Sequence, residues 1–188
     1  MNRFESHLTD SERVLLGSLV GATWDYYGGS SVVHEGRFAV SSLEIATSNG
    51  SIKVRTDLVA SPMESGPEDF AKLSVHLGAG TAPSAVPGGR LFFHEKGRSV
   101  ERVSIVRARV NASSFGEPMF TVSMDHGIVF HLSGRDLYVA RGGWFEETLE
   151  IVRSDRRLGH MIDIREDDWD STIEMTFDLH RELLEVRL

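Results

Sequence analysis

The sequence contains no cysteine, which excludes disulfide scaffolds, thiolate zinc sites and cysteine nucleophiles. It also has no basic excess, because 28 acidic residues outnumber 20 basic ones and the formal net charge is −8. Nucleic-acid-binding domains normally carry a basic stripe, so this acidic total argues against nucleic acid as a partner. Apolar residues make up 40% of the 188 positions. This composition is enough to bury a core, and we expect a single domain over residues 1–188.

Long apolar runs are missing near the N-terminus. The longest one there, Val14–Ala22, is about half of the ~20 residues that a membrane-spanning helix needs. Acidic residues precede this run, where a secretion signal would carry positive charge. We therefore expect a cytoplasmic protein that does not bind membranes.

A short helix is predicted over residues 10–20. Thr9 and Glu12 have the spacing of a capping box, in which two side chains accept backbone N–H groups at a helix start. Val14, Leu15 and Leu19 then give the helix one apolar face.

After Gly21 the sequence changes to an alternation of apolar and polar residues, which is typical of half-buried strands. Asn49-Gly50 indicates a hairpin, and Asp125-His126-Gly127 is interpreted as a turn between two strands. The predicted fold is mainly β, an antiparallel meander, sandwich or open barrel of about ten short strands with a short N-terminal helix. Residues 179–188 fit either a helix or a strand.

The charge is unevenly distributed along the chain. Residues 146–188 hold 13 acidic and 6 basic residues, a net charge of −7, whereas residues 90–109 hold 6 basic and 2 acidic ones, a net charge of +4. Such a separation can orient a charged partner. In a second interpretation, the two regions form adjacent strands whose charges pair across a sheet.

Two segments combine tryptophan with acidic residues. An exposed aromatic among carboxylates is suited to a basic protein surface, because aromatic side chains anchor interfaces and charges determine their specificity. The candidate partner-binding residues are Trp169, Asp167, Asp168, Asp170, Glu166, Trp144, Glu146 and Glu147.

The motifs of common cofactor and metal sites are missing. The sequence has no phosphate-binding P-loop, no His-Glu-x-x-His motif and no complete glycine-rich dinucleotide loop. We therefore expect no catalytic residues, no metal and no cofactor. The alternative is a small-ligand or metal-binding β-barrel protein, or an enzyme, with a site near Asp125, His126 and His131.

Met124–Val139 reads Met-Asp-His-Gly-Ile-Val-Phe-His-Leu-Ser-Gly-Arg-Asp-Leu-Tyr-Val, two apolar segments joined by a polar turn. This segment of 16 residues resembles small β-rich bacterial proteins, some of which are immunity proteins of polymorphic toxin systems. The resemblance implies an acidic, cytoplasmic, single-domain inhibitor that covers a toxin's active site. The sequence thus favours a non-enzymatic protein that binds a cognate protein with a basic surface, and it leaves the oligomeric state open.

Overall fold

The computed structural model describes residues 2–34, 37–60, 69–79, 90–95, 97–145, 147–155 and 172–187. Within these ranges lie one helix and twelve strands. In chain order they are β1 (Asn2–Ser6), α1 (Asp10–Gly17), β2 (Trp24–His34), β3 (Arg37–Val40), β4 (Ser42–Thr47), β5 (Gly50–Val59), β6 (Phe70–Leu77), β7 (Arg90–His94), β8 (Val100–Ser114), β9 (Glu117–Leu132), β10 (Arg135–Arg141), β11 (Leu149–Ser154) and β12 (Met175–Glu185).

The strands form two largely antiparallel sheets. The first has the order β12-β8-β9-β10-β11-β3, and the second has the order β2-β4-β5-β6, with β7 also paired to β2. The first half of β2 pairs with β4 and its second half with β3, so β2 connects the two sheets. Among the described strands, β12 and β6 end this path and do not pair with each other, so the sheets stay open. The prediction of a mainly β fold with one short N-terminal helix is confirmed.

The helix α1 begins where the capping residues predict. The Thr9 hydroxyl accepts the Glu12 N–H at 3.3 Å, and the Glu12 carboxylate accepts the Thr9 N–H at 2.7 Å. The helix ends at Gly17 rather than at residue 20, and a turn follows through Gly21, whose φ is +82°.

Glu12 also covers the outer edge of β6. Its Oε1 atom accepts the Val75 N–H at 2.9 Å, on the side of β6 that faces away from β5. Burial raises the pKa of Glu12, but hydrogen bonds from Thr9 and Val75 outweigh it and leave the pKa below its ordinary value. The ionised carboxylate thus caps the start of α1 and accepts one N–H group on the outer edge of β6. That N–H group would otherwise be available for pairing with a strand of another chain.

The predicted turn at Asp125-His126-Gly127 is wrong. Strand β9 continues through these residues and pairs with β8 on both sides of them. Asp125 lies opposite Arg107 and Gly127 opposite Val106, which leaves His126 as the extra residue of a β-bulge.

Two hydrophobic clusters form the core. The larger one lies between the sheets and includes Trp24 and Phe130, whose rings meet edge to face with centroids 5.2 Å apart. The smaller one gathers Phe70, Met124 and Trp144 with apolar residues of β8.

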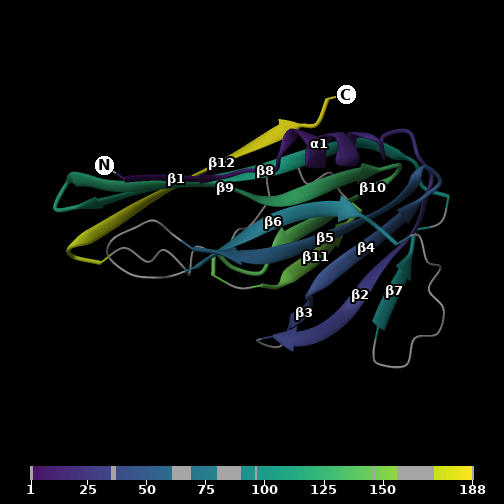
Figure 1. Ribbon diagram of the computed structural model, residues 1–188, viewed down its shortest axis with the longest axis horizontal. Coiled ribbons are helices and arrows are strands. Elements are labelled where there is room, and N and C mark those ends of the chain that lie inside the picture. The colour runs from purple at the N-terminus through teal and green to yellow at the C-terminus, as the bar shows by residue number, and fades with distance from the viewer. Residues whose placement is uncertain are drawn as a thin grey trace.

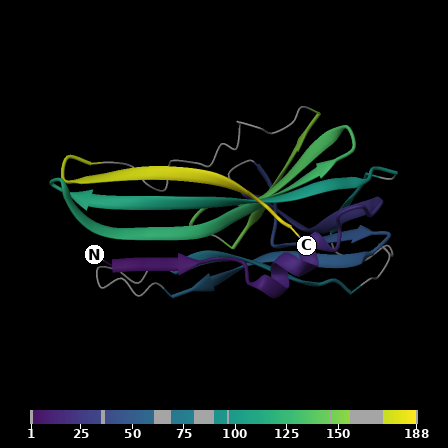
Figure 2. The same ribbon diagram turned by 90° about the horizontal axis from the view of Figure 1, so that it is seen from above.

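An arm extends past the second sheet, at the left of Figures 1 and 2. It consists of residues 107–125 of the β8–β9 hairpin, with the first half of β12 on one side and β1 on the other. The sequence of residues 179–188 fits either a helix or a strand. In the structure residues 175–185 form strand β12, which is antiparallel to β8.

Candidate functional site

Most of the partner-binding residues predicted from the sequence lie outside the described residues, namely Glu146, Glu166, Asp167, Asp168, Trp169 and Asp170. Of the other two, Glu147 is exposed and Trp144 is fully buried. The Trp144 ring packs in the smaller core cluster, with the Arg141 guanidinium 4.8 Å from its centroid. The Trp144 backbone carbonyl accepts the Ala71 N–H at 2.7 Å, which connects the segment that follows β10 to β6. Trp144 therefore does not offer its ring to a partner, which corrects that expectation.

Part of the charge separation is neutralised within the first sheet. Strand β12 pairs with β8, and Glu182 lies directly opposite Arg107. Glu185 Oε2 lies 3.9 Å from Arg102 Nη1. Acidic residues of the C-terminal region thus face the basic strand across the sheet, as the second interpretation of the charges predicts.

The three residues of the alternative site lie in separate surroundings. Asp125 accepts a hydrogen bond from Arg107 Nε at 2.8 Å. His126 Nδ1 lies 3.2 Å from Arg141 Nη2, whereas His131 hydrogen-bonds with a carboxylate of β10. Within the described part of the chain, no group of three or more histidine, aspartate and glutamate side chains could hold a metal ion.

Two histidines make the stability of the protein depend on pH. Complete burial holds the pKa of His126 well below its ordinary value, and the Arg141 and Arg181 guanidinium groups lower it further. Burial and the Arg107 guanidinium also lower the pKa of His7. Both histidines therefore stay neutral in the folded protein just below pH ~6.5, where the unfolded chain binds a proton at each.

We expect the free energy of unfolding to be fully retained above pH ~6.5 and to be lost progressively below it. The loss should reach at most about 1.4 kcal/mol per pH unit for each histidine. Urea denaturation across a series of pH values measures this dependence. The His126→Gln variant should flatten the profile, and His180→Gln on the exposed edge of β12 serves as the control. A slope that His126→Gln leaves unchanged would contradict the assignment.

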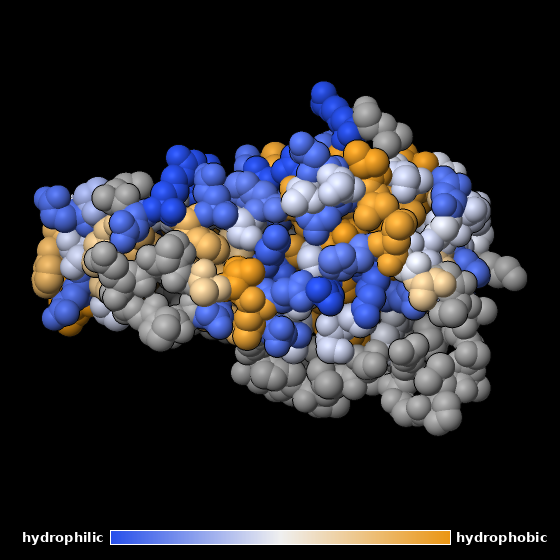
Figure 3. Space-filling view, in the orientation of Figure 1, coloured by the Kyte–Doolittle hydropathy of each residue, from blue (hydrophilic) through white to orange (hydrophobic). Residues whose placement is uncertain are grey.

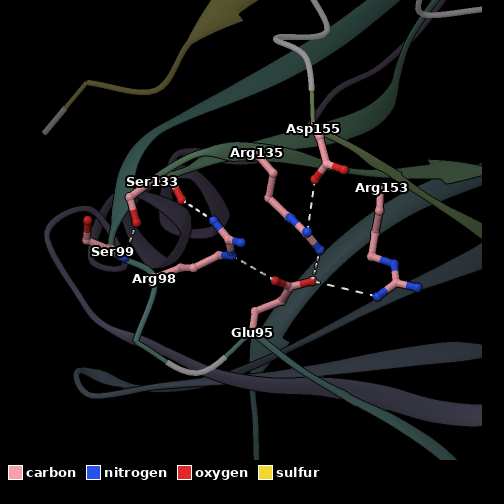
Figure 4. Close-up of polar contacts among 7 residues, drawn as sticks. All are labelled: Glu95, Arg98, Ser99, Ser133, Arg135, Arg153 and Asp155. Carbon is pink, nitrogen blue, oxygen red and sulfur yellow. Dashed lines mark hydrogen bonds and ion pairs between the residues drawn. The ribbon is translucent and has the colours of Figure 1, made fainter.

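Glu95 is the centre of an ion-pair cluster that joins the two sheets (Figure 4). Its buried carboxylate lies 3.2 Å from Arg98 Nε, 3.1 Å from Arg135 Nη1 and 3.9 Å from Arg153 Nη1. Arg98 also donates to the Ser133 carbonyl at the β9–β10 turn. The cluster connects the end of β7 with β10 and β11, and its single buried acid with three bases indicates a structural role.

The tip of the arm carries a strained and exposed aromatic residue. Phe115 and Gly116 connect β8 to β9 with φ angles of +48° and +85°. Two positive φ angles are typical of hairpin turns that favour Asn-Gly. A larger side chain in this conformation costs roughly 1–2 kcal/mol. Because Phe115 is 78% exposed, burial of its ring offsets little of that cost.

Neighbouring residues extend this surface. Ile173 is 99% exposed, and the Phe115 N–H donates to the Glu174 carbonyl at 3.1 Å, which places the approach to β12 against the turn. The side chains of Glu117 and Glu174 are exposed beside it. Figure 3 shows a narrow strip of apolar surface at the outer end of the arm, with hydrophilic surface beside it. We call Phe115, Glu117, Met119, Ile173 and Glu174 the arm tip.

The sequence patterns described above do not predict the arm tip. One local signal is present, because Phe115-Gly116 occupies a short hairpin turn where asparagine and glycine are preferred. The approach of Ile173 and Glu174 to this turn depends on the register between β12 and β8, which no local pattern reveals.

No helix in the described ranges is long and apolar enough to cross a membrane. Comparison of the chain with known protein families, curated proteins and solved structures gives no match. A function therefore has to be inferred from the chain's own residues.

Proposed function

We propose that the protein is an immunity-type inhibitor that acts on its target by binding and not by catalysis: its arm tip docks into a basic cleft on a cognate toxin. The observation that carries the proposal is the strained, exposed Phe115, together with two exposed acidic residues, Glu117 in the same hairpin and Glu174, whose backbone carbonyl accepts the Phe115 N–H. Backbone strain that is kept at a surface position is characteristic of functional sites, because packing alone does not require it. An aromatic anchor beside acids suits an apolar pocket framed by basic residues.

The overall charge supports the same kind of partner. A net charge of −8 attracts a basic protein at long range and raises the rate of encounter. The acidic segment around Trp169 would add to this attraction, and its part in binding stays a prediction. The arm brings its tip away from the body of the molecule, where it can enter a cleft (Figure 2).

The Phe115→Asn variant should bind its partner about tenfold more weakly or worse, since an interface anchor is removed. The same variant should be more stable by about 1 kcal/mol, because asparagine tolerates the left-handed conformation. Immobilised wild-type and variant proteins can be incubated with lysate of the source cells, and the affinity for the protein retained is then measured. Thermal unfolding provides the second measurement.

Two further variants control this experiment. Leu77→Asn makes the same kind of change at a 76% exposed apolar residue on β6 and should leave binding intact. Neutralising Glu117 and Glu174 with glutamine should reduce the salt dependence of the association rate. The protein retained from the lysate should be basic. As the expected toxin, it should inhibit growth when expressed alone and should no longer do so when the wild-type chain is co-expressed. Equal binding by wild-type and Phe115→Asn proteins would contradict the proposal.

A further inference from the structure

A line of hydrogen-bonded side chains crosses three neighbouring strands of the first sheet. Asp136 on β10 lies opposite His131 on β9, and its Oδ1 atom is 3.0 Å from His131 Nδ1. His131 Nε2 is 3.2 Å from the hydroxyl of Ser104 on β8. All three side chains are buried. The groups thus stand in the order carboxylate, imidazole, hydroxyl.

The neighbouring Arg102 favours one tautomer of His131. Its Nη2 atom lies 3.4 Å from His131 Nε2, and a guanidinium group can only donate hydrogen bonds. This contact favours the neutral ring with its proton on Nδ1, donated to Asp136, and with Nε2 as the acceptor. The single lone pair of Nε2 can then accept the Ser104 hydroxyl in place of Arg102, which is the starting arrangement for base-assisted attack by a serine.

Two half-exposed charged residues, Arg102 and Glu185, are neighbours of the buried Ser104. The residue is 1% exposed, but its neighbours on the same side of the sheet, Arg102 and Glu185, have side chains that are 43% and 48% exposed. Glu185 lies directly opposite Ser104, and its carboxylate is 3.9 Å from Arg102. Half-exposed pairs of this kind contribute little stability, and a nucleophilic role for Ser104 requires that these two side chains rotate to admit a substrate.

We propose that Ser104 is a nucleophile, activated by His131 and Asp136, that takes acyl groups from small activated esters. As Ser104 Oγ bonds to the ester carbonyl carbon, its proton moves to His131 Nε2. The carbon–oxygen bond to the alcohol then breaks, and the alcohol leaves with that proton. Water attacks the acyl-serine with the same assistance, which releases the carboxylic acid and restores Ser104. This activity is independent of the arm tip.

The same chain contains a matched control for this geometry. Ser123 is also 1% exposed, and its hydroxyl is 3.0 Å from His7 Nε2. Among the described residues, His7 has no carboxylate hydrogen-bonded to its other ring nitrogen. A serine–histidine contact without the carboxylate should not activate the hydroxyl to the same degree.

The first experiment exposes the folded protein to a small fluorophosphonate and locates the adduct by mass spectrometry. We expect a single phosphonyl adduct on Ser104, lost in Ser104→Ala and His131→Gln and kept in Ser123→Ala. Circular dichroism checks that each variant is folded. No adduct on the wild-type chain, or equal labelling of Ser104 and Ser123, would overturn the proposal.

The second experiment uses the absence of cysteine from this sequence. Ser104→Cys introduces a single thiol, whose alkylation by iodoacetamide can be followed against pH. At mildly acidic pH this thiol should react about tenfold faster than the one in Ser123→Cys, because an imidazolium partner stabilises the thiolate. Adding Asp136→Asn should remove the difference. Equal rates for the two single-cysteine proteins would show that the hydrogen bonds among Ser104, His131 and Asp136 only satisfy buried polar groups. The proposal would then fail.

Discussion

Replacing Glu95 with alanine should lower the free energy of unfolding by about 1–3 kcal/mol, because a buried carboxylate with charged hydrogen-bond donors is lost while its arginine partners keep partial access to water. The loss arises because the guanidinium groups of Arg98, Arg135 and Arg153 would remain near one another without the carboxylate between them. Urea denaturation followed by tryptophan fluorescence measures it, since Trp24 and Trp144 are both in the core.

The exposed Glu147 offers a matched control for this change. Glu147→Ala should alter the free energy of unfolding by no more than about 0.5 kcal/mol. Double-mutant cycles should give a larger coupling of Glu95 with Arg135, at 3.1 Å, than with Arg153, at 3.9 Å. A loss below about 1 kcal/mol for Glu95→Ala would mean that the cluster does not hold the sheets together.

The Asp125→Ala variant should lose about 3–5 kcal/mol, the range for removing one member of a buried ion pair, since the Arg107 and Asp125 side chains are only 16% and 1% exposed. One carboxylate oxygen accepts Arg107 Nε at 2.8 Å, and the other accepts the Leu8 N–H at 2.7 Å. The substitution would leave the Arg107 guanidinium without this carboxylate and the peptide between β1 and α1 without its acceptor. Hydrogen exchange should therefore show that β1 loses protection well before β5 does.

Asp125→Asn separates the hydrogen bond from the charge. Its amide oxygen can still accept the Leu8 N–H, while the charge that faces Arg107 is gone. We expect a smaller loss than for Asp125→Ala, with β1 largely protected. The assignment fails if β1 is equally protected in the wild-type and Asp125→Ala proteins.

Local signals in the sequence predict the elements well. Thr9 and Glu12 start α1 because a capping box depends only on residues three apart. Asn49-Gly50 leads from β4 into β5, and the alternation of apolar residues follows the observed strands. These features involve neighbours in the chain, so they can be identified without knowing how the strands pair.

The environment of an aromatic residue is not a local property. Trp144 shortly precedes Glu146 and Glu147, and Trp24 precedes Asp25, yet both tryptophan rings are fully buried. Adjacent residues of a strand point to opposite faces, so an acid next to an aromatic does not show which face is exposed. That depends on what packs against the sheet.

The functional candidates depend on strand register. The Phe115 N–H reaches the Glu174 carbonyl only because β12 and β8 pair in this register. Likewise, Ser104 reaches His131, and His131 reaches Asp136, only because β8, β9 and β10 pair as they do. A single residue of slippage would turn these side chains to the opposite face of the sheet. Residue types alone therefore gave, as the alternative site, the triplet Asp125, His126 and His131, whose members the structure places apart.

The parallel pairing of β1 with β9 determines when β1 can take its native position during synthesis of the chain. Asn2 pairs with Phe120, and Ser6 pairs with Met124. At about 5–20 residues per second, a ribosome synthesises the partner strand roughly 6–24 s after β1 itself. Throughout that interval the edge of β9 with which β1 pairs does not yet exist, so β1 is open to binding by a chaperone. A strand made early in synthesis therefore reaches its native place only after the second sheet and β8 have been translated.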